Sequence, residues 1–187
     1  MANVSRIRGF VPSKSLLGAP WQSLVRQYNA DAAKAISISI GDAVTLDTDG
    51  NVIQAVSGGV ILGVVVAIGS GQTQFTGADS SQGYFNADDL GQRSLPAATA
   101  GVVGVCPAEG VLYNVYDNSI DLDLKVGDTA DIVVGAGNAV TGNSIMALTT
   151  NSNIDVKVVE YNTQPTNDRA LVSAQYIVKF ESTENSI

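Results

Sequence analysis

The sequence of 187 residues contains no histidine and only one cysteine, Cys106. Histidine is the side chain that most often serves as a general base near neutral pH, so histidine-based triads and most zinc sites are excluded. A single cysteine cannot form an internal disulfide, and within the apolar run 101–106 we expect it to be a small buried hydrophobe. Both absences argue against an enzyme.

Long apolar runs are also missing. The longest, residues 60–68, is interrupted by Gly63 and is far shorter than the roughly 20 residues of a membrane helix. No apolar stretch follows the first basic residues, as a secretion signal would require. We therefore expect a protein that is made in the cytoplasm and does not bind a membrane.

Charged residues make up only 15% of the chain, against 45% apolar residues and nineteen glycines. This composition is too hydrophobic for a disordered chain, and the glycines indicate many turns between short strands. The net charge of −8 is uneven, because residues 1–30 contain four cations and no acid, whereas the remainder has a net charge of −12. An acidic body is repelled by phosphate backbones, so we expect no direct binding to nucleic acid. The basic segment is suited to an acidic protein neighbour, or it only keeps a terminus soluble.

Strand patterns dominate from residue 36 onward. Residues 36–40 alternate isoleucine with serine, and residues 47–51 form an Asp-Gly turn cluster between two apolar runs. Further apolar runs recur at short intervals up to residue 180, which is typical of a sandwich or barrel. We predict an all-β protein with a single, jelly-roll-like β-sandwich; another small β-barrel or β-tulip topology is the alternative. Residues 1–35 are predicted to be an extended N-terminal arm, and residues 36–187 the body with a long loop at about 69–95.

Other motifs favour turns over chemistry. Residues 135–142 are glycine-rich, but their spacing does not fit a dinucleotide fingerprint. Residues 47–51 resemble the start of a calcium loop but lack the required glycine and glutamate positions. Most acids lie in turns, where they support backbone geometry. We expect no cofactor and no metal; a carboxylate-based hydrolase is a weak alternative.

One internal similarity is visible. Ile40-Gly41-Asp42 and Val126-Gly127-Asp128 each precede a strand and a later Gly-Asn turn. Either an old duplication or the shared turn chemistry of two hairpins can explain it, and the second is favoured.

Several segments resemble the head decoration (cement) proteins of tailed bacteriophages, in the same order along the chain. They are residues 1–10, 17–21, 25–28, 40–44, 61–66, 131–137, 141–142 and 146, with the last strand around Val178. Residues 69–95 match no pattern of that family. The resemblance implies a β-rich structural protein, without catalytic residues, on the outer capsid surface of a virion. Its implied partners are a major capsid protein of the HK97 type and further copies of itself, as a homodimer or homotrimer.

Within this interpretation the N-terminal segment supplies the contacts. Aromatic groups dominate interface energetics, and arginines can form forked bonds with carboxylates. The predicted partner-binding residues are Arg6, Arg8, Phe10, Lys14, Trp21, Arg26 and Tyr28. A second hypothesis is a non-catalytic, carbohydrate-binding module on a phage fibre or tail, in which Tyr84 and Phe85 of the polar loop stack on a sugar ring.

Overall fold

The structure is a computed structural model that describes residues 7–69, 93–118, 122–138, 140–150, 152–162, 167–168 and 171–183. Within these ranges the chain forms strands and one short 3-10 helix, η1 (Trp21–Leu24), and no α-helix. The predicted all-β class is confirmed. No helix of the described segments has the length and apolar character needed to cross a membrane.

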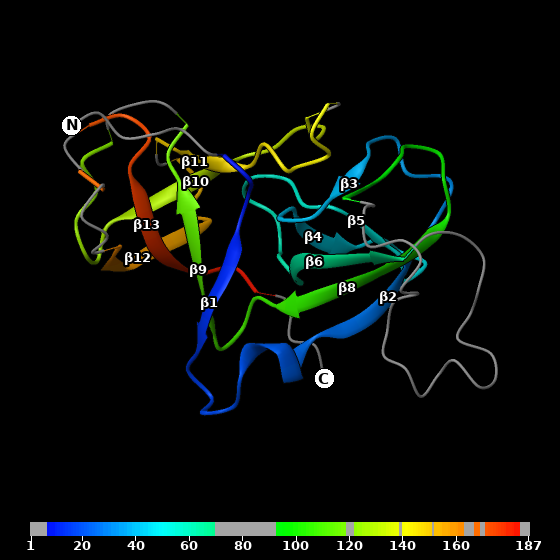
Figure 1. Cartoon of the computed structure of the whole chain (residues 1–187), viewed down its shortest axis with the longest axis horizontal. Coiled ribbons are helices and arrows are strands. Elements are labelled where there is room, and N and C mark those ends of the chain that lie inside the picture. Colours follow the sequence, from blue (N-terminus) through cyan, green and yellow to red (C-terminus); the bar gives the residue numbers. More distant parts are fainter. Residues whose placement is uncertain are drawn as a thin grey trace.

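Two antiparallel sheets form the body (Figure 1). One has the strand order β2-β8-β6-β4-β5, with β2 (Arg26–Ala30), β8 (Gly101–Pro107), β6 (Gly63–Gly69), β4 (Ala43–Leu46) and β5 (Val52–Gln54). The other has the order β1-β9-β13-β12-β10-β11, with β1 (Val11–Ser15), β9 (Val111–Tyr116), β13 (Gln175–Phe180), β12 (Val156–Tyr161), β10 (Thr129–Val133) and β11 (Ala147–Thr149). A short pair, β3 (Ile38–Ser39) and β7 (Ser94–Leu95), lies beside the first sheet.

The chain changes from one large sheet to the other only after β1 and after β8. Each sheet is therefore built almost entirely from one continuous stretch. This arrangement differs from a jelly roll, in which strands alternate between the sheets, so the two-sheet architecture is confirmed with another strand order.

The two sheets contain the same five-stranded unit. In chain order, β2, β4, β5, β6 and β8 of unit A correspond to β9, β10, β11, β12 and β13 of unit B, and both units have the same spatial order. The residue pairing also agrees: Val65 pairs with Val105 just before a break in register, and Val158 pairs with Val178 just before the corresponding break. The internal similarity in the sequence thus marks a structural repeat.

The glycine-aspartate turns show how closely the units agree. In unit A, Asp42 Oδ2 accepts the Ser39 N–H at 2.8 Å, and Val65 N–H donates to Asp42 O at 2.9 Å. In unit B, Asp128 Oδ2 accepts the Lys125 N–H at 2.8 Å, and Val158 N–H donates to the Asp128 carbonyl at 2.9 Å. The prediction that the similarity reflects turn chemistry alone is wrong, because the same turn precedes the second strand of the same five-stranded unit twice.

Each unit curls around its own core. The interior of unit A contains Val44, Val52, Val65, Val103 and Val105. The interior of unit B forms a larger core, which continues onto one face of unit A. Alternate residues of β4 and β6 serve the two cores, as the two-residue period of a strand requires. The two units therefore share buried surface.

The predicted N-terminal arm is part of both sheets. β1 pairs with β9 in unit B, and β2 pairs with β8 in unit A, all antiparallel. Over its described part, the segment is thus no free extension, and no boundary falls at residue 35. Most of the predicted loop, residues 70–92, lies outside the described residues; β6 reaches Gly69, and β7 contains Ser94 and Leu95.

Candidate protein-binding surface

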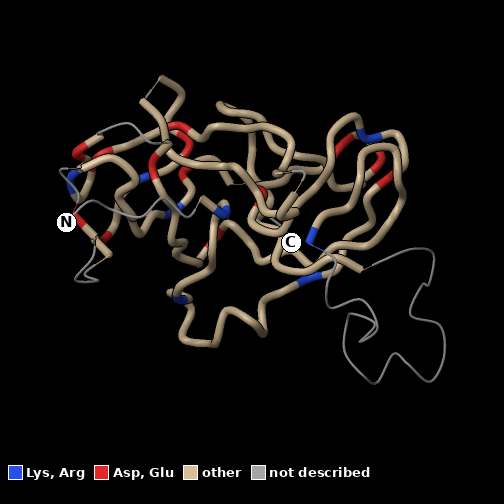
Figure 2. Tube along the Cα trace, turned by 45° about the horizontal axis from the view of Figure 1, so that its top comes forward, with Lys and Arg blue, Asp and Glu red and all other residues tan. Residues whose placement is uncertain are grey.

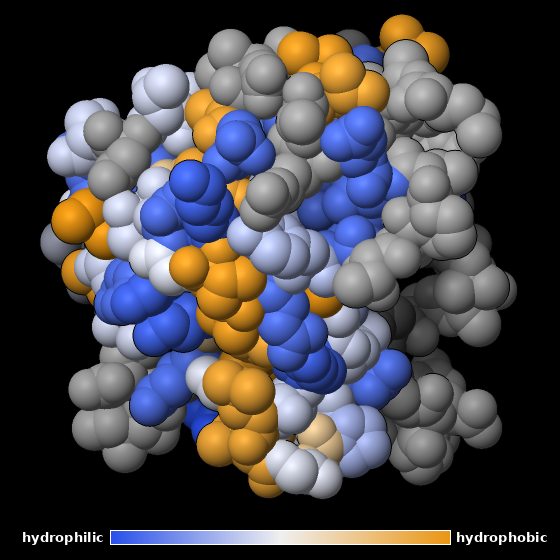
Figure 3. Space-filling model, turned by 90° about the vertical axis from the view of Figure 1, so that its left-hand side faces the viewer, coloured by the Kyte–Doolittle hydropathy of each residue, from blue (hydrophilic) through white to orange (hydrophobic). Residues whose placement is uncertain are grey.

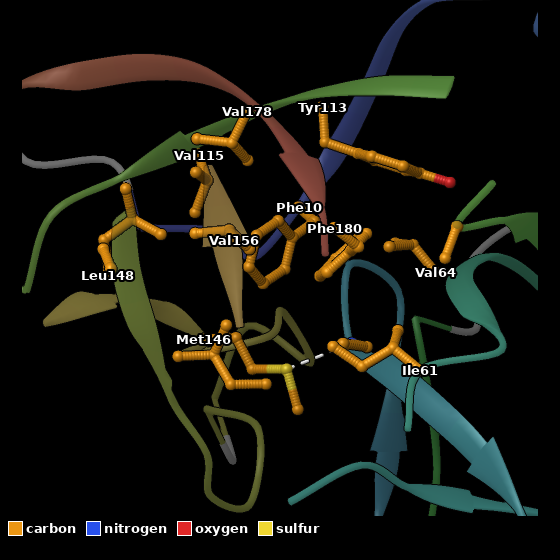
Figure 4. Packing of buried hydrophobic residues seen from close by; sticks show 14 of the residues in the cluster. Phe10, Ile61, Val64, Tyr113, Val115, Met146, Leu148, Val156, Val178 and Phe180 are labelled. Atoms are coloured by element: carbon orange, nitrogen blue, oxygen red, sulfur yellow. Dashed lines mark hydrogen bonds between the residues drawn. The ribbon is translucent and has the colours of Figure 1, made fainter. Parts of the chain in front are cut away.

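Phe10, predicted to bind a partner, lies in the shared core. Its side chain is 1% exposed. Its ring lies 4.9 Å from that of Phe180 and 6.5 Å from that of Tyr113, measured between centroids, at the centre of the cluster in Figure 4. The prediction of an accessible anchor is wrong. Phe10 directly precedes β1, which pairs within the body, and its side chain fills the space between the two units.

The other two predicted aromatic residues are half-buried. Trp21 packs against the large core from η1, and Tyr28 packs against the core of unit A from β2. Their rings mainly attach the N-terminal segment to the body. Only their exposed edges are accessible to a partner.

The predicted cations are exposed but are not gathered into one cluster. Arg8 precedes β1, Lys14 lies on β1, and Arg26 begins β2 of the other sheet; Arg6 lies outside the described residues. Lys14 Nζ forms an ion pair with Glu160, whereas Arg8 and Arg26 have no ion-pair partner within the described ranges. Figure 2 shows the basic positions spread along the molecule, with acids concentrated toward both of its ends.

Two leucines that the sequence did not single out are the most prominent apolar groups of this region. Leu16 and Leu17 are 61% and 66% exposed in the connection between β1 and η1, at the lower end of the molecule in Figure 1. Their backbone is firmly held: Leu16 N–H donates to Gly110 O at 2.7 Å, and Leu17 N–H donates to Ser15 Oγ at 3.0 Å. Adjacent leucines before Gly18 are the sequence signal that could have identified this turn.

The face in Figure 3 carries an apolar band between hydrophilic side chains, and the band reaches the lower end of the molecule. Isolated exposed apolar residues are ordinary, but contiguous exposed apolar surface is typical of a protein-binding surface. We name the connection Ser15–Leu24, with its flanking cations Lys14 and Arg26, the leucine turn.

Three buried aspartates bind backbone groups and hold loops in place. Asp155 accepts Ser57 Oγ–H and Gly58 N–H of unit A, both at 2.7 Å, and Ile132 N–H at 2.9 Å. Asp117 accepts the backbone N–H groups of Ser173 and Ala174. These bonds orient turns and tie the units together, as expected of acids in turns.

Asp131 holds the loop before β12. Its carboxylate accepts the backbone N–H groups of Ser152, Asn153 and Ile154 and the Ser152 hydroxyl. Burial alone raises the pKa of Asp131, but the Ser152 hydroxyl and the three N–H groups together bring that pKa below its ordinary value. The bonds also offset the strain at Ile154, whose φ of 63° is rare for a β-branched residue.

Asp42 is also buried, but its carboxylate has a different set of hydrogen-bond partners. Its Oδ2 accepts Ser39 N–H at 2.8 Å and Gln54 Nε2–H at 3.0 Å, and the same amide group donates to Gly135 O of unit B at 2.8 Å. Asp42 Oδ1, Ser39 Oγ and Gln54 Oε1 are buried without a hydrogen-bond partner in the described part of the chain. Burial raises the pKa of Asp42 to about 6, against the opposing effects of the Ser144 hydroxyl, the Ser39 N–H and the Gln54 amide.

Among the described residues there is no group of three or more acidic or cysteine side chains placed to hold a metal ion. Tyr84 and Phe85, on which the sugar-binding hypothesis depends, lie outside the described residues. A scan against models of protein families, a search of curated proteins and a search of solved structures each return no match. The resemblance to decoration proteins therefore stays a prediction.

Proposed function

We propose that this chain is a non-catalytic structural protein that decorates the outside of a virus shell. It binds the lattice of major capsid protein and joins neighbouring capsomers. The leucine turn carries this proposal: Leu16 and Leu17 project from a firmly held backbone, in a connection that Lys14 precedes and Arg26 follows in the sequence. The order of the family-like segments along the chain also supports it.

The body suits such a role because it is internally tied. Ile61 N–H of unit A donates to Ser182 O at 2.9 Å, just beyond the last strand of unit B. Asp155 and Gln54 form further bonds between the units. A rigid body presents its contact surface without ordering it first, which lowers the entropic cost of each contact.

The contact itself combines apolar burial with charge. Fully burying a leucine side chain contributes roughly 1.5–3 kcal/mol. Lys14 is already paired with Glu160, but Arg26 is exposed and has no ion-pair partner within the described ranges, so an acidic protein surface is complementary to Arg26. Repetition over many copies, each of which can contact a further copy as homodimer or homotrimer, makes a modest individual contact hard to reverse.

The test uses purified chain and expanded phage capsids that lack decoration protein, followed by co-sedimentation. Leu16→Ser combined with Leu17→Ser should lower the affinity by at least about tenfold, because the variant no longer buries two leucine side chains on binding. Val140→Ser is the matched control, because Val140 is 94% exposed far from the leucine turn in the sequence. Circular dichroism and thermal melting show whether each variant is folded.

Two outcomes contradict the proposal at different levels. If the unaltered chain fails to sediment with any capsid, the decoration role is wrong. If the double variant coats capsids as well as the unaltered chain, the leucine turn is not the contact.

A further inference from the structure

Comparison of the two units shows one difference at their edges. In unit B, the outer side of β9 is paired with β1, where Val11 lies opposite Asn114 and Pro12 opposite Tyr113. The matching strand of unit A is β2, in which Gln27 and Arg26 occupy the positions of Asn114 and Tyr113. No described strand pairs with the outer side of β2. Among the described residues, unit A thus has an open position where unit B holds a sixth strand.

Curling of the sheets does not close this position. The opposite edge strand β5 contacts β2 in unit A, and the equivalent strand β11 contacts β9 in unit B. Because β9 still pairs with β1, this approach leaves the outer hydrogen-bonding side of the strand accessible. The equivalent contact of β5 therefore does not by itself block the outer side of β2.

The exposed edge strands differ in their protection against pairing. β1, the edge of the six-stranded sheet, contains Pro12 and a register break between Pro12 and Lys14. Proline, bulges and edge lysines are features that prevent a further strand from joining. β2 has five consecutive pairs with β8, no break and no proline. Of these two long edges, β2 is the one that can accept another strand.

We propose that the outer edge of β2 binds an extended, acid-bearing segment of another protein, which adds antiparallel as a sixth strand of unit A. This mode of binding is known as strand addition: backbone hydrogen bonds supply affinity and side chains on alternate residues supply selectivity. The inference rests on the proposed function only in assuming that the chain binds a protein surface.

Charge decides the kind of segment. Arg26 is exposed at the start of β2 and has no ion-pair partner in the described ranges. In the register of β1 on β9, one residue of the added strand lies directly opposite Arg26, and an opposite charge there is favourable. A second copy of β2 brings another arginine and no acid, so a different, acidic segment is the better occupant.

The probe is a synthetic peptide of alternating threonine and valine with one central glutamate, added to isotope-labelled full-length chain. Amide chemical shifts should change saturably at β2, and a peptide with lysine in place of glutamate should bind at least about threefold more weakly. Arg26→Glu should reverse this preference. Lys125→Glu makes the same charge change at an exposed site in unit B and should leave the preference unaltered.

Absence of shifts at β2, or equal binding of both peptides, overturns the inference. Concentration-dependent self-association that perturbs β2 overturns it as well, because a second copy is then the occupant. The result is separable from the capsid experiment. A chain that coats capsids but ignores the peptides loses only the strand addition, and one that binds the peptides but no capsid loses only the decoration role.

Discussion

Lowering the pH from 7.5 to 4.5 should stabilise this protein through Asp42. The carboxyl is buried, and its pKa is raised to about 6 from an ordinary value of 3.8. The folded state therefore holds this proton more tightly than the unfolded state does. Stability supplied by the neutral acid is complete below about pH 4 and is lost as the pH rises through about 6.

The size of the effect follows from the same two pKa values. Each pKa unit corresponds to about 1.4 kcal/mol, so ionising Asp42 in the folded state costs roughly 3 kcal/mol. Asp42→Asn removes the charge and retains an oxygen that can accept the Ser39 N–H. The unfolding free energies of the variant and the original chain should converge below about pH 4, differ by about 1 kcal/mol near pH 4.5, and differ by up to about 3 kcal/mol at pH 7.5, in favour of the variant.

Urea unfolding followed by tryptophan fluorescence measures both proteins across this pH range. The difference between them isolates Asp42 from the other acids, including Asp131, whose lowered pKa acts in the opposite direction at lower pH. Asp128→Asn is the control, because Asp128 makes the same turn bonds in an exposed setting. A difference between the Asp42 variant and the original chain that stays constant with pH, or grows toward acid, refutes the reasoning.

Two further substitutions test the packing. Phe10→Ala should lower the unfolding free energy by about 3–5 kcal/mol, because it empties the centre of the shared core; a loss below 1 kcal/mol in chemical denaturation contradicts this placement. Gly63→Ala should cost about 1–3 kcal/mol, because the added Cβ would lie 2.2 Å from Cys106 O. Gly135→Ala, whose Cβ would meet only the flexible Ile145 side chain, should be milder. Equal melting temperatures of the two glycine variants argue against a close approach at Gly63.

Local patterns predicted the strands well where turn chemistry sets them. The Asp-Gly turn joins β4 and β5 as expected: Asp47 accepts the N–H groups of Asp49 and Asn51. The isoleucine alternation overestimated one strand, since β3 covers only Ile38 and Ser39.

The sequence alone did not allow the pairing of distant strands to be predicted. Nothing near β1 or β2 reveals that their partners are β9 and β8, so the segment was taken for an arm and Phe10 for an anchor. The matching Gly41-Asp42 and Gly127-Asp128 pairs were visible, but only strand order and register show that whole units correspond. The leucine turn was overlooked because exposure depends on how the surrounding strands pack.

The pairing of β1 with β9 also constrains the order of folding. Unit A contains all strands needed for its own ladder, whereas Val11 must wait for Asn114, which lies more than half of the chain further along. During synthesis, β1 is made first but pairs with β9 late, because hydrogen-bond ladders between residues distant in the sequence form slowly. A nascent chain released before unit B is made would therefore expose Phe10, and its first strand would be left to pair with whatever edge is nearest.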